Sequence, residues 1–328
     1  MKRLKFLTVF VVILTVLALV LSSCGSSKGV IAEFRGKKIM LSDYNLLIDF
    51  NARLCEEEFK QYILDALRFA SFLESKNVKI SNEQFENAEL EIKKEYFYEN
   101  SLLEDYLEIA NSAKIDYNIL KTSLKYYSRC LAARKEFYEY ANSTFVMPDN
   151  AEESEDILRT RHIEALEAEA KKQEVSIKTS GTSSINGVYD VESVYLAATA
   201  FSVALNKANT VKAISLYYGI NFLYGKNADL TTQAAYLETI KDSLKTISGI
   251  EVILKEMQVD FDSFFNNAQN YYKNVFVYEQ LTQKFFEEEY HLKKTAGVLP
   301  KEVESYENYV EYILLLTASE CKINLEEF

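Results

Sequence analysis

The sequence predicts a mainly α-helical protein, built of amphipathic helical modules with a small N-terminal β-hairpin and a short C-terminal strand. Only two of its 328 residues are proline and nine are glycine, which favours long helices with few tight turns. Over long stretches apolar side chains recur every three or four residues, the period of a helix that buries one face. Alternation of apolar and polar residues, the period of a strand, occurs in short segments near the two ends.

Residues 1–23 have the order of an export signal. Lys2, Arg3 and Lys5 precede an uncharged apolar run over residues 6–21, and small residues follow the run. A membrane-spanning helix is the alternative interpretation. Sixteen residues rise only about 24 Å as a helix, which is short of a hydrocarbon core of roughly 30 Å. We therefore expect residues 1–23 to be a signal peptide.

Leu21-Ser-Ser-Cys24 resembles the lipobox of bacterial lipoproteins. The resemblance implies that Cys24 is the first mature residue and carries diacylglycerol. Two or three acyl chains, at about 0.8 kcal/mol per buried methylene, hold a protein stably on a membrane. We therefore expect an extracytoplasmic protein, anchored to the cell membrane through the lipid on Cys24, with residues 24–29 as a tether.

The charge balance limits the classes of partner. The chain has a formal charge of −12, and removal of the signal leaves 34 basic and 49 acidic side chains, a charge of −15. Nucleic acids and lipid head groups are bound through clustered Lys and Arg, so an anionic surface argues against both as partners of the folded body. No sequence motif indicates a bound cofactor.

Residues 30–148 are predicted to form the first helical module. Alternation over residues 30–39 around Gly36 predicts a small hairpin. Ser42 and Asp43 then offer an N-cap for a helix, because their side-chain oxygens can accept from orphan backbone N–H groups.

Residues 44–140 read as helix almost throughout. Phe59, Ile63 and Leu67, for example, are spaced by four residues each. Ser81 is followed three residues later by Gln84, which fits a capping box that opens a new helix.

The remaining chain divides into three parts. Residues 149–184 contain a charged, acidic helix and then a Ser/Thr/Gly-rich stretch without apolar periodicity, which indicates a linker. Residues 185–300 form a second helical module. Residues 301–328 contain a final helix and an alternating segment, residues 321–325, that can add a strand.

The two modules resemble each other. A shift of 150 residues places Phe72–Asn77 on Phe222–Asn227, and a shift of 144 places Ile115–Asn118 on Val259–Asp262. The matches occur in the same order in both modules, so we expect two copies of one unit rather than a solenoid.

Residues 30–48 resemble the opening of the SurA and PrsA type of extracytoplasmic chaperones, with Arg35-Gly36 in place of the usual Asn-Gly turn. Residues 72–85 are similar to that family's helix, short turn and helix start, and residues 103–131 to its next long amphipathic hairpin. Residues 306–325 resemble the C-terminal helix and strand that, in the family, return to complete the chaperone module.

The resemblance implies an ATP-independent holdase and foldase that binds unfolded exported chains without catalysis. Such a protein presents apolar side chains on an adaptable surface and binds many partners weakly. The alternative is a non-chaperone lipoprotein that binds one specific protein or cell-envelope partner.

Many members of that family also carry a parvulin-type prolyl isomerase domain, a Gly-rich α/β fold with two central histidines. This chain has His162 and His291 alone, and an acidic helix follows His162 where a strand is expected. We therefore expect no isomerase and no catalytic residues. Two histidines without a matching cysteine pattern make a transition-metal site unexpected too.

Cys55, Cys130 and Cys321 are widely spaced and lie in or beside helical segments. We expect small buried hydrophobic residues, and a disulfide between two of the three is the open alternative. The runs of consecutive glutamates are expected to lie on solvated helix faces.

Aromatic residues are the most suggestive set for binding. Tyr126–Tyr127, Tyr217–Tyr218 and Tyr271–Tyr272 are adjacent pairs, and residues 96–98 form an aromatic run. Adjacent residues on a helix point about 100° apart, so one tyrosine of each pair is expected to be buried and the other to lie at the boundary. The pairs fit either a tyrosine-rich core or a peptide-binding surface lined with amphipathic rings. The residues that bind the substrate are not specified by the sequence.

Overall fold

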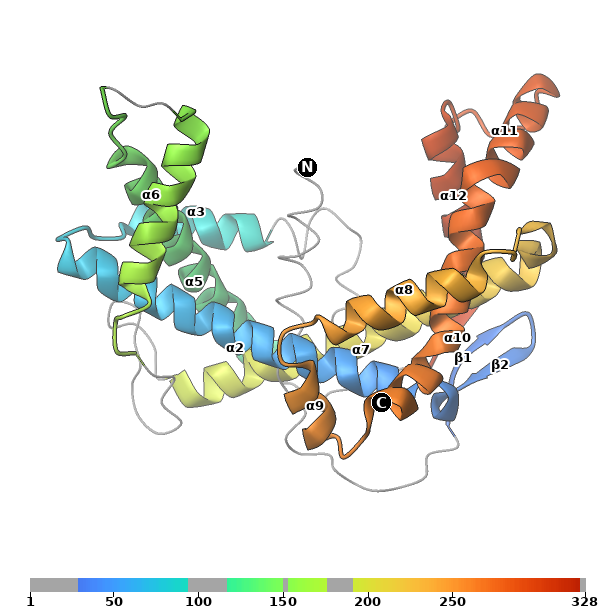
Figure 1. The fold of residues 1–328 in the computed structure, drawn as a ribbon, viewed down its shortest axis with the longest axis horizontal. Helices are drawn as coiled ribbons and strands as arrows, with labels where there is room; N and C mark the ends of the chain where they lie inside the picture. The colour runs from blue at the N-terminus through green and yellow to red at the C-terminus, as the bar shows by residue number, and fades with distance from the viewer. Residues whose placement is uncertain (1–28, 94–116, 150–152, 176–190, 325–328) are drawn as a thin grey trace. The chain divides into compact units, whose positions relative to one another are not determined.

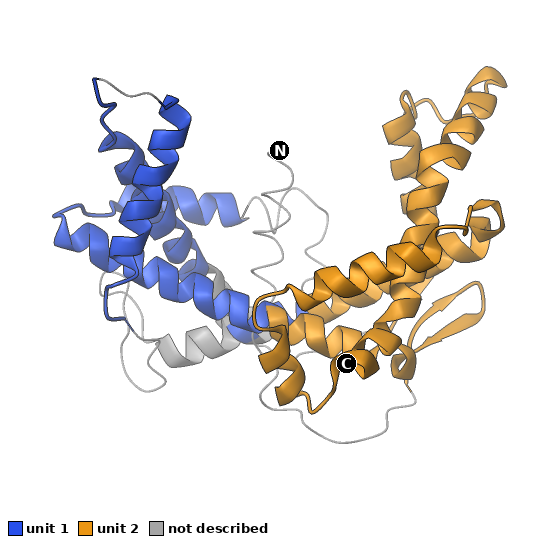
Figure 2. Cartoon of the chain, viewed as in Figure 1, with its two compact units in different colours: residues 1–20, 55–205 blue, residues 21–54, 206–328 orange. Residues whose placement is uncertain are grey.

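The computed structural model describes residues 29–93, 117–149, 153–175 and 191–324. The fold is mainly α, with a small antiparallel sheet, as the sequence predicts (Figure 1). The chain divides into two compact units, drawn in Figure 2: residues 1–20 with 55–205 form unit 1, and residues 21–54 with 206–328 form unit 2. The unit boundaries fall inside two long helices, α2 (Asn45–Ser75) and α7 (Val191–Tyr224).

The sheet of unit 2 brings together two segments nearly 300 residues apart. Strands β1 (Val30–Phe34) and β2 (Lys37–Met40) form the predicted hairpin. Arg35 and Gly36 at its turn have φ of 47° and 78°, and positive φ at both central residues is what a type I′ turn requires. Strand β3 (Cys321–Ile323) pairs with the other side of β1, so the strand order is β2-β1-β3.

The core of unit 2 packs helices on this sheet. It joins the start of α2 and the later part of α7 to α8 (Gln233–Lys245), α9 (Ile250–Glu256) and α10 (Phe261–Gln280). Gly219 allows a close approach between three elements, because a Cβ there would lie 2.8 Å from both Phe34 and Thr317. Thr317 lies on α12 (Tyr306–Ser319), so the glycine lets α7 pack against both the sheet and that helix.

The N-terminus of α2 is capped by a residue far along the chain. The Oδ1 atom of Asn267 on α10 accepts from the backbone N–H groups of Leu46 (3.1 Å) and Leu47 (3.3 Å). Its Nδ2 atom donates to the carbonyl of Ser42 at 3.2 Å. Residues 41–43 form a turn of 3₁₀ helix instead. The expected cap at Ser42 or Asp43 was therefore wrong, because a long-range amide takes that role.

The last part of unit 2 is a helical extension. After α10 the chain passes through a π-helical turn (Leu281–Phe285) into α11 (Phe286–Thr295), and α12 packs back against it. Tyr309 of α12 is fully buried and donates to Glu289 at 2.7 Å, and Lys293 lies within 3.1 Å of the same carboxylate. Polar contacts therefore support the apolar packing between α11 and α12.

Unit 1 consists of the rest of α2 with α3 (Asn82–Lys93), α5 (Tyr117–Ser143) and α6 (Glu155–Ala170). Its core is aromatic: the rings of Phe69 and Phe137 stack at 3.9 Å between centroids, and Phe72 meets Phe137 edge-on at 5.5 Å. The predicted capping box of α3 is confirmed, since Ser81 and Gln84 exchange backbone and side-chain hydrogen bonds.

The two units share a proline-containing turn between two helices. In unit 1, α5 leads to a turn with Val146-Met-Pro148 and then to α6; in unit 2, α11 leads to a turn with Val298-Leu-Pro300 and then to α12. Pro148 and Pro300 are the only prolines of the chain. Ser154 and Ser305 precede α6 and α12 as N-cap residues. The shared turn agrees with the repeat in the sequence, and the duplication itself stays a prediction.

Candidate functional site

The expected lipidation site, Cys24, and the aromatic run of residues 96–98 lie outside the described residues. Within the described ranges, no helix is both long and apolar enough to cross a membrane. The site that can be built from the structure therefore lies in the helical units.

Three cysteines lie in the described part of the chain, and burial limits the reactivity of two of them. Cys55 and Cys130 are buried, Cys321 is half-buried, and no disulfide joins them in the described part of the chain. Burial raises the pKa of Cys130 to about 12 and that of Cys321 to about 11. Because the thiolate is the nucleophilic form, these two residues are inert at neutral pH.

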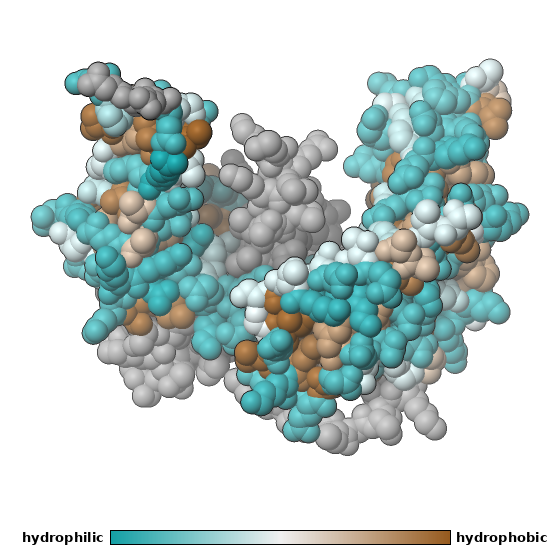
Figure 3. All heavy atoms as spheres, in the orientation of Figure 1, coloured by the Kyte–Doolittle hydropathy of each residue, from teal (hydrophilic) through white to brown (hydrophobic). Residues whose placement is uncertain are grey.

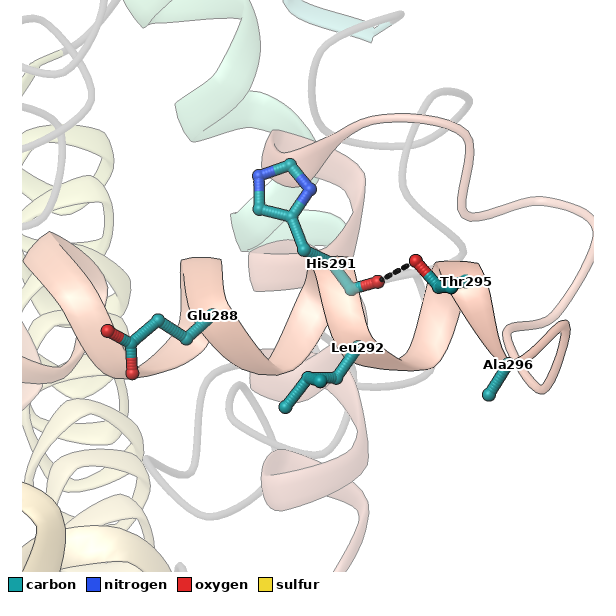
Figure 4. Close-up of a pocket in the computed structure, with 5 residues that line it drawn as sticks. All are labelled: Glu288, His291, Leu292, Thr295 and Ala296. Carbon is teal, nitrogen blue, oxygen red and sulfur yellow. Dashed lines mark hydrogen bonds between the residues drawn. The ribbon is translucent and has the colours of Figure 1, made fainter.

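The two histidines lie in different units. The Nε2 atom of His162 is 3.2 Å from Thr144 Oγ1, and its ring packs on Phe145 in the turn before α6. His291 lies on the outer face of α11, where Glu288, Leu292 and neighbouring residues line a shallow depression of about 610 Å³ (Figure 4). In the described residues no three His, Cys, Asp or Glu side chains are grouped so that they could hold a metal ion.

A group of tyrosines is the most distinctive binding feature. Its members share half-buried rings on α7, α8 and α10, and we call them the tyrosine seam: Tyr217, Tyr236, Tyr271, Tyr272 and Tyr278. Tyr217 of α7 contacts two rings of α10, with centroids 5.8 Å from Tyr271 and 5.4 Å from Tyr278. Tyr236 of α8 packs on Phe276, with centroids 5.1 Å apart. Ring contacts thus join Tyr217, Tyr271, Tyr272 and Tyr278, and all five seam rings are half-buried.

The seam hydroxyls are hydrogen-bond donors at neutral pH. Burial, with the nearby Glu279 carboxylate as a second cause, raises the pKa of Tyr236 to about 12 and also raises that of Tyr217. Burial raises the pKa of Tyr272 to about 12. A protonated phenol is a weak nucleophile and base, so the seam is suited to contact rather than to proton transfer.

The expectation that one tyrosine of each pair is buried was wrong. Tyr126 and Tyr127 of α5 are both buried, and the ring of Tyr127 stacks on Tyr62 of α2 at 5.5 Å between centroids. In the pairs Tyr217–Tyr218 and Tyr271–Tyr272, all four side chains are half-buried. Tyr218, Tyr271 and Tyr272 pack against the core of unit 2 without being enclosed by it.

Sequence reasoning missed Tyr236 and Tyr278 as members of the seam, and Glu279 as the carboxylate near it. Tyr278 follows Tyr271 by seven residues, two helical turns, so the spacing alone places both on one face of α10. Tyr236 lies on a different helix, and only tertiary packing brings it to the seam.

Exposed apolar side chains form separate groups. Figure 3 shows hydrophilic residues over most of the face drawn, with hydrophobic residues between them. The large exposed side chains are Leu90, Val146, Met147 and Ile157 in unit 1, and Phe222, Leu230, Val252, Leu292, Val298, Leu315 and Leu316 in unit 2.

Comparisons of the chain with protein-family models, with curated proteins and with solved structures found no match.

Proposed function

We propose that this protein is a membrane-tethered extracytoplasmic chaperone that holds unfolded exported chains without catalysis. The observation that carries the proposal is the sheet of unit 2, in which the C-terminal strand β3 pairs with the N-terminal hairpin. A returning C-terminal helix and strand is the feature that the sequence shares with the SurA and PrsA type of chaperones. The lipobox at residues 21–24 supports the tether.

The tyrosine seam is the proposed contact surface for clients. Its rings are rigid and amphipathic, so they can contact apolar side chains of many sequences while their hydroxyls donate to peptide carbonyls. Such contacts need no fixed partner geometry, which suits a surface that binds unfolded chains weakly. The hydroxyls of Tyr236 and Tyr272 are protonated at neutral pH, and the Glu279 carboxylate lies beside the hydroxyl of Tyr236.

The proposal is tested by suppression of aggregation. The chain from Gly25 onward is mixed at stoichiometric ratios with several unrelated unfolded proteins, whose fluorescence can be followed because this chain has no tryptophan. Tyr236→Ala removes one ring of the seam, and we expect it to weaken suppression. Tyr140→Ala is the matched control, because Tyr140 is also half-buried but lies in unit 1, where it packs on Phe72.

Failure of the unaltered protein to suppress aggregation of any client would contradict the proposal. An equal loss of aggregation suppression in both variants, at equal melting temperatures, would show that the tyrosine seam is not the surface that contacts clients. The second candidate, a lipoprotein that binds one specific protein or envelope partner, is favoured by the dispersed exposed apolar groups in Figure 3. Suppression for a single client among many would favour that candidate.

A further inference from the structure

The turn between α11 and α12 has an unusual composition for this acidic chain. Residues 290–301 contain three lysines, one histidine and no acidic residue, whereas the whole chain has 49 acidic and 37 basic side chains. The same segment carries two of the most exposed large apolar side chains of unit 2: Leu292 is 71% exposed and Val298 is 66% exposed. Figure 2 shows the pair of helices α11 and α12 extending away from α8 and the sheet within unit 2.

Backbone geometry fixes the positions of Leu292 and Val298 at the turn between α11 and α12. Gly297 has a φ of 67°, and its N–H donates to the carbonyl of Lys294, while the N–H of Val298 donates to the carbonyl of Lys293, both at 3.1 Å. This is a Schellman motif, in which the residue after the glycine lies near the last turn of the helix. Val298 and Leu292 are therefore both held near the α11–α12 turn. Figure 4 shows Leu292 on the outer surface of α11.

Three lysines lie in the same segment as these side chains. Lys294 donates to the hydroxyl of Tyr290 at 2.7 Å, which orients its ammonium group, and Lys301 is exposed just after the turn. Lys293 is paired with Glu289 and contributes less net charge. Apolar side chains flanked by ammonium groups match a surface of acyl chains beneath anionic head groups.

The corresponding turn of unit 1 provides an internal contrast. Val146 is 80% exposed and Met147 is 40% exposed, so this turn is as apolar as its counterpart. Residues 136–158, however, contain acidic residues and no lysine or arginine. Exposure of apolar side chains is thus common to both turns, whereas the cation at the unit 1 turn is Arg159, which lies 4.8 Å from the Phe145 ring centroid and is paired with Glu155.

We infer that the α11–α12 turn docks on an anionic phospholipid surface, with Leu292 and Val298 entering the acyl boundary and Lys294 and Lys301 at the phosphates. The inference rests on the proposed function in one respect, because a lipid on Cys24 would bring that surface within reach. The net charge of the chain opposes binding to head groups as a whole, and residues 290–301, between Glu289 and Glu302, are the stretch with lysines and no carboxylate where contact would occur. One acyl signal and one surface signal together give firmer attachment than either alone.

The test uses the absence of tryptophan from the chain. Val298→Trp and Val146→Trp each place one reporter at an exposed position, in full-length protein reconstituted in vesicles of phosphatidylcholine with or without phosphatidylglycerol. We expect emission of the V298W protein to shift to shorter wavelength and to be quenched by brominated lipid in the anionic vesicles alone. Emission of the V146W protein is expected to stay at the wavelength of an exposed indole.

The lysines are tested in the V298W background. Lys301→Gln should weaken the docking about fivefold, because one lysine near an anionic surface contributes on the order of 1 kcal/mol, and high salt should weaken it further. Quenching in both reporter proteins, in neither, or equally in neutral vesicles would overturn the inference. The readout is local and is the same whether the chain is held by its apolar N-terminal run or by acyl groups, so failed acylation of Cys24 would be recognised separately by mass spectrometry.

Discussion

The two units both contain a proline-containing turn between two helices but are held together differently. Unit 1 packs phenylalanines of α2 and α5 into an aromatic core, with Phe69 and Phe137 stacked face to face. Unit 2 uses a sheet, a long-range amide cap and a polar network around Tyr309. The difference teaches that a helical unit can be stabilised mainly by ring packing or mainly by contacts between distant segments of the chain.

The comparison predicts the largest effect in the aromatic core. Phe137→Ala removes a buried ring that contacts both Phe69 and Phe72, and we expect unit 1 to lose about 3–5 kcal/mol of unfolding free energy. Urea titration followed by far-UV circular dichroism measures the loss. Phe222→Ala is the control, because the Phe222 ring is exposed and its removal should reduce the unfolding free energy far less. Equal losses in the two variants would show that the aromatic core does not dominate unit 1.

The next effect concerns the cap of α2 in unit 2. Asn267→Ala leaves the backbone N–H groups of Leu46 and Leu47 without their acceptor, and we expect a loss of about 1–3 kcal/mol. Hydrogen exchange of those two amides should accelerate in the same variant. Asn270→Ala, at an exposed position one turn further along α10, serves as the matched control. Unchanged exchange rates would argue against the cap.

A substitution at Gly219 is expected to reduce the unfolding free energy by a similar or smaller amount than the loss of the Asn267 cap. Gly219→Ala places a Cβ 2.8 Å from Phe34 and Thr317, and such overpacking costs about 1–3 kcal/mol. Thr317→Ser removes the methyl group on one side of the contact and keeps the hydroxyl. The double variant should therefore recover part of the stability, as measured by thermal unfolding. A double variant that is less stable than the sum of its single changes would exclude this packing argument.

The smallest effect is expected at the surface pair between the hairpin turn and the end of α12. Arg35 forms two hydrogen bonds with Glu320, and the pairing lowers the pKa of that carboxyl group from 4.5. A lowered pKa in the folded state stabilises the fold above pH 4.5, and the stabilisation is lost as the pH falls through the lowered value. The melting temperatures of the unaltered protein and Glu320→Gln should therefore differ at neutral pH and converge in acid. If the difference in melting temperature stayed the same at every pH, the charge of Glu320 would not be the cause of the stabilisation.

Local patterns predicted local structure well. Alternation around Gly36 predicted the hairpin, Ser81 and Gln84 predicted a capping box, and alternation after residue 320 predicted the last strand. Each depends on residues within a few positions of each other, where backbone preferences decide the outcome.

Those local patterns could not predict contacts between residues that are distant in the sequence. The cap that Asn267 provides joins residues more than 200 positions apart, and no local signal marks an asparagine in the middle of a helix as a cap. Tyr236 enters the tyrosine seam only through the packing of α8 on α10. The long apolar periodicity after residue 191 predicted one helical block, whereas Gly249 and Gln258, both with positive φ, separate α8, α9 and α10.

The pairing of β3 with β1 sets an order of events during synthesis of the chain. Residues 30–34 are synthesised early, yet their second partner, residues 321–323, follows almost 300 residues later. Until then one edge of β1 has unpaired backbone groups, which in an unfinished chain invite pairing with other strands. Unit 1 contains its aromatic core within residues 69–170 and can fold while synthesis continues. The sheet of unit 2 is therefore completed only after residues 321–323 have been synthesised.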